Sequence, residues 1–152
     1  MAMAERVMSG RITTSTIDAV EHCTQFAAAQ AHEAGFSLAR VREIELVVEE
    51  VVSNICGHSY GGHPGSVELS CERLDGANLA LEFIDYGRPF DILALPMPDL
   101  AVDLDQRDPG GVGVPMFRAL VDHATYRRED LRNILQVIVH AAPKLRSDPA
   151  AR

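Results

Sequence analysis

A carboxylate, an amide and an imidazole stand four residues apart in the segment 47–60, VVEEVVSNICGHSY. If this segment is helical throughout, Glu50, Asn54 and His58 project from nearly one face. An Asn side chain supplies the hard oxygen that Mg²⁺ prefers, and a Glu beside it can take a proton from an attacking hydroxyl. The spacing therefore predicts a metal and phosphate site along this helix.

Each of these residues also has an ordinary structural interpretation. A single Glu on a helix rich in acids, such as Glu50, is most often a solvated side chain. Asn54 shifts the balance, because Asn is a mediocre helix former and needs a polar partner within an apolar stretch. His58 alone is more typical of a satisfied side chain near a helix end than of a metal ligand. Cys56 and His63 complete only part of a zinc pattern, which lacks its fourth ligand.

A second candidate lies in the box DYGRPFD over residues 85–91. Asp85 ends an alternating strand pattern, and the simplest interpretation is a turn in which its side chain bonds the backbone two residues on. The functional interpretation is a carboxylate at a pocket mouth that accepts a hydrogen bond from an exocyclic amine such as that of adenine. Gly87 would then let the ring lie against bare backbone.

A third candidate is the run Gly110-Gly111-Val112-Gly113, which precedes a predicted helix. Glycines before a helix N-terminus expose amides to an anion, and the helix dipole adds positive potential. A flexible hinge at the end of a long loop explains the same run equally well. No lysine follows Gly113, so the run is not a P-loop. Arg107 could reach a phosphate, or it could be an exposed loop charge.

Length and composition favour one soluble globular domain over residues 1–152. The chain has 152 residues, of which 47% are hydrophobic and 24% charged, and a net charge of −8. That acidity disfavours a nucleic-acid partner bound through its phosphates. Three cysteines without paired spacing predict free thiols in a reducing cytosol. No signal peptide and no apolar run of about 18 residues is visible, so we expect a cytoplasmic protein without a membrane partner.

The periodicity of apolar residues predicts the elements that position these candidates. It predicts helices over 17–34, 38–58 and 114–122, and strands over 66–73, 78–85, 124–128 and 133–140. The expected apolar faces of the first two helices are Ile17, Val20, Ala27, Ala31 and Ala34, then Val41, Ile44, Val47, Val48, Val51, Val52 and Ile55. Hydroxyl residues over 13–16 could cap the first helix, Gly35 fits its end, and Ser37 fits the next N-cap.

The remaining segments complete a two-layer expectation. Residues 1–12 are compatible with a ragged first strand, 91–110 form a long aperiodic loop of the kind that serves as a lid, and the tail 141–152 should be frayed. Helices grouped together and strands paired with their neighbours predict an α+β sandwich, with helices on one face of a mixed, mostly antiparallel sheet. Its core should span about 13–140.

Taken in order, these boxes resemble one known family. The matching residues are Glu50-Val-Val-Ser-Asn54 with His58 and Tyr60, Asp85-x-Gly87-x-Pro89-Phe90-Asp91, Gly110-Gly111-x-Gly113, Leu120-Val121-Asp122 and Arg132-Asn133-x-Leu135. The chain is similar over 16–140 to the bacterial anti-sigma-factor serine/threonine kinases of the RsbW and SpoIIAB type. These are small members of the GHKL ATPase superfamily, so the resemblance implies its ATP-binding fold. Gly57, Pro115 and the N-terminal segment depart from the family pattern.

The resemblance assigns roles to the catalytic and base-binding candidates. Glu50 matches the general base, and Asn54 matches the ligand of a Mg²⁺ ion that bridges the phosphates. Asp85 matches the aspartate that binds the adenine amine, with Gly87 beneath the ring.

The same resemblance places Gly111 and Gly113 at the phosphates of ATP or ADP and makes 91–110 the ATP lid. We add His58 and Arg107 to the nucleotide-binding set. In this family the kinase phosphorylates an anti-sigma-factor antagonist, sequesters a sigma factor and commonly forms a homodimer.

Three other functions stay open at this point. The first is a catalytically silent nucleotide-binding module that regulates by partner binding alone, although such a module would be free to lose Glu50. The second is the ATP-binding domain of a sensor kinase, which the lack of a phospho-acceptor histidine domain in 152 residues disfavours. The third is a metal hydrolase built on His58 and His63, which is remote.

Overall fold

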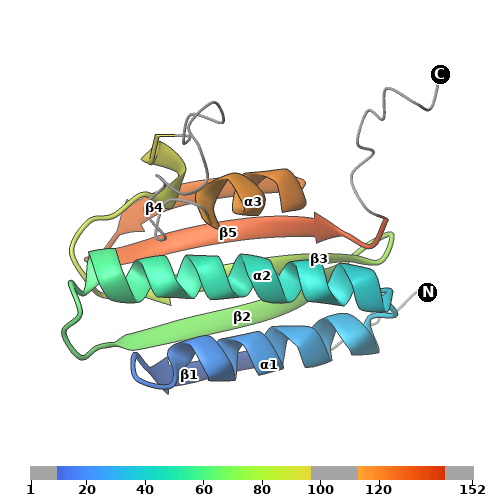
Figure 1. The fold of residues 1–152 in the computed structure, drawn as a ribbon, viewed down its shortest axis with the longest axis horizontal. Coiled ribbons are helices and arrows are strands. Elements are labelled where there is room, and N and C mark those ends of the chain that lie inside the picture. The colour runs from blue at the N-terminus through green and yellow to red at the C-terminus, as the bar shows by residue number, and fades with distance from the viewer. Residues whose placement is uncertain (1–9, 97–112, 143–152) are drawn as a thin grey trace, which may run out of the picture.

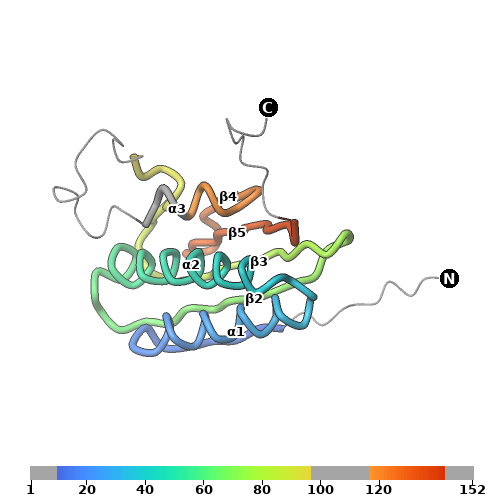
Figure 2. Tube along the Cα trace, turned by 45° about the vertical axis from the view of Figure 1, so that its right-hand side comes forward, coloured from blue at the N-terminus to red at the C-terminus, as the bar shows by residue number. Residues whose placement is uncertain are grey.

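Helices cover one face of a five-stranded sheet in the computed structural model, which describes residues 10–96 and 113–142 (Figure 1). The elements are β1 Gly10–Ser15, α1 Ala19–Glu33, α2 Leu38–Asn54, a π-helix Ile55–Ser59, β2 Ser66–Leu74, β3 Asn78–Asp85, a 3₁₀ turn Ile92–Ala94, α3 Gly113–Leu120, β4 His123–Glu129 and β5 Arg132–His140. Figure 2 shows α2 lying between α1 and α3. The predicted two-layer α+β architecture is confirmed.

The sheet has the order β1-β2-β3-β5-β4, and each of its strand pairs in the described chain is antiparallel. The two predicted hairpins are present as β2–β3 and β4–β5. The last strand, β5, lies between β3 and β4 instead of at an edge. This order makes Asp85 of β3 and Asn133 of β5 register partners.

Apolar periodicity located the core correctly for α2 and in part for α1. All seven apolar positions expected on α2 and the π-helix after it are buried, and α1 buries Ala19, Cys23, Ala27 and Ala31. Ile17 is 88% exposed, because α1 begins only at Ala19. The hydroxyl cluster does not cap α1, since residues 13–15 belong to β1. Gly35, with φ of +83°, follows the end of α1, and the Ser37 hydroxyl caps α2 by accepting from the Arg40 amide at 3.1 Å.

The predicted helix to His58 is wrong in its last turn. The α-helix ends at Asn54 and continues as a π-helix, in which the Tyr60 amide donates to the Ile55 carbonyl at 3.1 Å. Arg88 explains the wider turn, because its backbone N–H donates to Ser59 O at 2.9 Å and its Nε donates to His58 O at 2.7 Å. The four-residue repeat is therefore lost after Asn54, and His58 does not continue the line from Glu50.

A buried arginine, which the sequence patterns did not single out, ties the helices to the end of the sheet. Arg40 is 2% exposed and donates to Asp122 Oδ2 at 2.9 Å and to Glu43 Oε2 at 2.6 Å. It also donates to the backbone carbonyls of Leu120 at 3.0 Å and His140 at 2.9 Å. The C-terminal end of α3 is thereby held against α2 and β5. Among the helices that the structure describes, none is long and apolar enough to cross a membrane.

Candidate functional site

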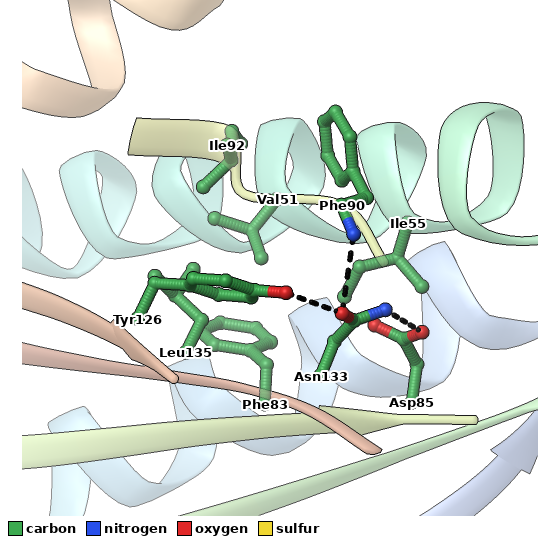
Figure 3. A pocket seen from close by; sticks show the side chains of 9 residues that line it. All are labelled: Val51, Ile55, Phe83, Asp85, Phe90, Ile92, Tyr126, Asn133 and Leu135. Carbon is green, nitrogen blue, oxygen red and sulfur yellow. Dashed lines mark hydrogen bonds between the residues drawn. The ribbon is translucent and has the colours of Figure 1, made fainter. Parts of the chain in front are cut away.

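A small pocket opens between the end of α2 and the inner face of the sheet (Figure 3). It is lined by Val51, Ile55, Phe83, Asp85, Phe90, Ile92, Tyr126, Asn133 and Leu135. Six of these side chains are aliphatic or phenyl groups, and the polar ones converge at one end. The cavity volume is about 20 Å³, enough for a single water molecule. A flat heterocycle therefore needs the walls to move apart before it can enter.

Asp85 supplies the acid of this pocket and is only 2% exposed. Its Oδ1 accepts from the Gly87 amide at 3.0 Å and from Asn133 Nδ2 at 2.8 Å. Burial raises the pKa of Asp85, while hydrogen bonds from Asn133, Gly87 and Ser59 and the charge of Arg128 lower it. The turn interpretation of Asp85 is confirmed, and the same carboxylate lines the pocket. Its hydrogen bond to an exocyclic amine stays a prediction.

Close packing against the π-helix by itself explains why residue 87 is a glycine. A Cβ at this position would lie 2.4 Å from Ser59 O, inside the backbone of the π-helix. Only glycine lets the turn after β3 approach that closely, and the Arg88 amide then bonds Ser59 O at 2.9 Å. Contact between Gly87 and the face of a ring stays a prediction.

Asn133 is the polar residue whose role the sequence patterns missed. It is 3% exposed, and its amide lies at the centre of the polar end of the pocket (Figure 3). Its position carried a signal, since Asn133 alternates with Leu135, Val137 and Val139 on the inner face of β5. A polar residue at the start of such an apolar series needs partners. Strand order was required to know that Asp85 is one of them.

Glu50 and Asn54 form a different kind of site at the end of α2. Asn54 Nδ2 donates to the Glu50 backbone carbonyl at 2.6 Å, which is the partner that the sequence required. Glu50 Oε2 is buried and has no hydrogen-bond partner within the described chain. Burial is the largest cause that raises the pKa of Glu50 to about 7, a backbone hydrogen bond from Phe117 lowers it, and Glu49 raises it. A carboxylate with that pKa can accept a proton near neutral pH.

His58 lies beside the pocket and not, as predicted, in line with Glu50. Its ring stacks on Phe90 with centroids 4.6 Å apart and an interplanar angle of 6°. Of the glycine run, Gly113 begins α3, whereas Gly111 and Arg107 lie outside the described residues.

The predicted lid is described only over its first six residues, 91–96. They include a 3₁₀ turn whose Ile92 is buried and lines the pocket. The part of the lid over 97–110 lies outside the described residues.

The residues at this site fit a metal ion whose coordination comes mainly from a bound phosphate compound and only in small part from side chains. In the described chain no group of three His, Cys, Asp or Glu could hold a metal ion by itself. The partial zinc pattern of Cys56, His58 and His63 gains no further ligand there. A Mg²⁺ ion brought by phosphates needs few protein ligands. Asn54 carries a suitable oxygen one helical turn from the unpartnered oxygen of Glu50.

Comparisons with known proteins give consistent results. The family model described as "Histidine kinase-like ATPase domain" matches residues 13–139. The serine/threonine-protein kinase BtrW of Bordetella bronchiseptica is 32% identical over 108 residues, which cover 70% of this chain and 75% of that protein.

Two solved structures share the fold. One contains the RsbU and RsbW domains of a Mycobacterium tuberculosis protein, with a TM-score of 0.61 and 17% identity over 88% of this chain and 32% of that one. The other is the blue-light activated histidine kinase of Erythrobacter litoralis, with a TM-score of 0.51 and 18% identity over 80% of this chain and 41% of that one.

Proposed function

Because the chain belongs to the histidine kinase-like ATPase family, we propose that it is an ATP-dependent serine/threonine kinase that regulates transcription by partner switching. The observation that carries this proposal is Glu50, a half-buried carboxylate with a pKa raised to about 7 and an oxygen that no described group satisfies. A structural glutamate would have been paired or solvated. An acid kept in this state is suited to proton transfer.

The nucleotide base belongs in the pocket of Figure 3. Asp85 would accept a hydrogen bond from the exocyclic amine of adenine at the polar end. Val51, Ile55 and Ile92 would contact the faces of the ring, because they line the apolar part of the same pocket. The phosphates would then extend toward the end of α2.

Phosphoryl transfer needs positioning and charge stabilisation more than covalent chemistry from the protein. In the proposed step the hydroxyl oxygen of a serine or threonine attacks the γ-phosphorus, Glu50 takes the hydroxyl proton, and ADP leaves. Asn54 would provide one oxygen ligand to Mg²⁺, whose chemistry there is to neutralise phosphate charge. Gly113, at the start of α3, would bring a helix N-terminus to the phosphates.

Similarity to a serine/threonine-protein kinase and to an RsbW-containing structure supports regulatory proteins as partners. We propose that the substrate is an anti-sigma-factor antagonist and that the sequestered partner is a sigma factor, bound by a homodimer. The net charge of −8 suits a basic patch on such a partner.

The test begins with calorimetric titration of ADP and ATP, with and without Mg²⁺, into the wild-type chain and Asp85→Asn. We expect Mg²⁺-dependent binding that Asp85→Asn weakens. Transfer from γ-labelled ATP to a candidate antagonist should then require Glu50. No nucleotide binding by the wild-type chain would overturn the proposal.

One observation favours a second candidate function. The pocket volume of about 20 Å³ leaves no room for a purine between walls in these positions. A module of this shape could hold a partner without using nucleotide at all. Partner binding that is unchanged by ATP or ADP, in a chain that binds neither, would support this candidate and contradict the kinase.

A further inference from the structure

The Asn133 amide uses its full hydrogen-bonding capacity inside the pocket. Its Nδ2 donates to Asp85 Oδ1 and to the Arg88 carbonyl, each at 2.8 Å. Its Oδ1 accepts from the Tyr126 hydroxyl at 2.6 Å, from Arg128 Nη1 at 3.1 Å and from the Phe90 amide at 3.2 Å. A primary amide has two N–H donors and two acceptor lone pairs, so nothing is left over for a ligand.

The same partners define which way the amide points. Arg128 and the Phe90 backbone can only donate at these contacts, so they must face Oδ1. The Arg88 carbonyl can only accept, so it must face Nδ2. A flipped amide would set donors against donors on one side and acceptors against acceptors on the other. Asn133 therefore presents an N–H group to Asp85.

This donor determines which oxygen of Asp85 is available to a ligand. Asn133 Nδ2 and the Gly87 amide both donate to Oδ1, and Ser59 adds one more hydrogen bond to the carboxylate, so Oδ2 keeps a lone pair for an incoming N–H group. We propose that Asn133 is a positioning residue that fixes the orientation of the Asp85 carboxylate as an acceptor and so makes the site prefer a purine with an amino group at C6 over one with an oxygen there. This role rests on the proposed nucleotide-binding function and names what sets its base preference.

The charges around Asp85 agree with the geometry. Burial raises the pKa of Asp85, and the hydrogen bond from Asn133 is the largest of the causes that lower it. Of the described residues, the titratable or charged groups that face Asp85 are Cys56 on the π-helix and Tyr126 and Arg128 on β4. Without the Asn133 donor the carboxyl would hold its proton to a higher pH. A protonated Asp85 can donate to a C6 oxygen and loses its preference for an amine.

The test compares ADP with inosine diphosphate, which carries oxygen at C6, in wild type and Asn133→Leu. Both nucleotides are titrated calorimetrically between pH 5 and 8. In the wild type ADP should bind more tightly, and its affinity should fall as Asp85 is protonated at low pH. In Asn133→Leu we expect the affinity ratio of ADP to inosine diphosphate to shrink about tenfold, and the loss of ADP affinity to begin at a higher pH.

Gln136→Leu is the matched control. It also replaces an amide side chain on β5 with Leu, three residues along on the opposite face of the sheet, and should leave both the ratio and the pH dependence as in the wild type. A merely structural role for Asn133 would weaken both nucleotides equally. An unchanged ratio and pH dependence in Asn133→Leu, with ADP still bound by the wild type, would overturn the positioning role alone.

A second variant keeps the proposal testable if Asn133→Leu does not fold. Asn133→Asp keeps the shape of the side chain, but its carboxyl must share a proton with Asp85. ADP affinity should again be lost at a higher pH than in the wild type, and an unshifted profile would overturn the role. A wild-type chain that binds neither nucleotide would overturn the proposed function first and this role with it.

Discussion

Two carboxylates of the candidate site, Asp85 and Glu50, differ in the hydrogen-bond partners that surround them. Desolvation is the largest cause that raises the pKa of both Asp85 and Glu50. Asp85 is then surrounded by donors from Asn133, Gly87 and Ser59 and by the Arg128 charge. Glu50 receives one backbone donor, from Phe117, and keeps an oxygen without a partner among the described residues. The first acid is prepared to accept hydrogen bonds and the second to accept a proton.

The difference arises from the elements that carry them. Asp85 ends a strand, and the neighbouring strand β5 places Asn133 directly opposite. Glu50 lies near the end of α2, where its own backbone carbonyl already accepts the hydrogen bond from Asn54 Nδ2. The sheet therefore gives Asp85 its hydrogen-bond partner Asn133, whereas the end of α2 leaves one oxygen of Glu50 for a ligand. Four experiments test this difference between the surroundings of Asp85 and Glu50.

The largest effect should follow from Glu50→Gln. Phosphoryl transfer should fall by about 100- to 10,000-fold, because the variant lacks the proton acceptor, while ADP affinity stays near the wild-type value. Initial rates with γ-labelled ATP measure this. Glu45→Gln, on the same helix, is the control and should keep its rate. Equal rates in Glu50→Gln and the wild type would remove Glu50 from catalysis.

Asp85→Asn should act on binding instead. We expect ADP affinity to fall about tenfold or more, because a charged acceptor is lost, with little change for inorganic pyrophosphate. Calorimetry of both ligands measures the difference. Glu82→Gln, on the outer face of β3, should change neither affinity. A variant that binds ADP as tightly as the wild type would show that Asp85 does not contact the base.

Gly87→Ala tests whether the polar end of the pocket depends on backbone contact. A Cβ 2.4 Å from Ser59 O forces the turn away from the π-helix, so the free energy of unfolding should fall by about 1–3 kcal/mol. Urea denaturation measures it. Gly57→Ala is the control, since its Cβ would meet nothing within 4 Å, and it should be neutral or stabilising by up to about 1 kcal/mol. Equal stability of the two variants would contradict the contact.

The smallest effect concerns pH and Glu50. Its pKa rises from 4.5 to about 7 on folding, so its contribution to stability is fully present below pH 4.5 and is lost as pH rises through about 7. The loss should be about 1 kcal/mol once its partial exposure to solvent is considered. Denaturation without nucleotide at pH 5 and 8 should show the decline in the wild type and a smaller one in Glu50→Gln. Parallel profiles would mean that Glu50 is paired in solution.

Local patterns were sufficient for most of the helices and strands. The apolar period of α2, the Ser37 cap and both hairpins were predictable, because each depends on neighbours within a few residues or on one buried face. The contacts of Asn133 and Arg40 were not, since their partners lie 48 and 82 residues away and depend on the order of strands. The π-helix after Asn54 likewise depends on Arg88, which reaches it from the far side of the β2–β3 hairpin.

The place of β5 between β3 and β4 has a consequence for protein synthesis. Asp85 and Asn133 are separated by 48 residues, which a ribosome adds in roughly 2–10 seconds at ~5–20 residues per second. During that interval β3 has an open edge and Asp85 lacks its partner. A chain that ends before Asn133 has Asp85 and α2 but lacks the strand that completes the polar end of the pocket.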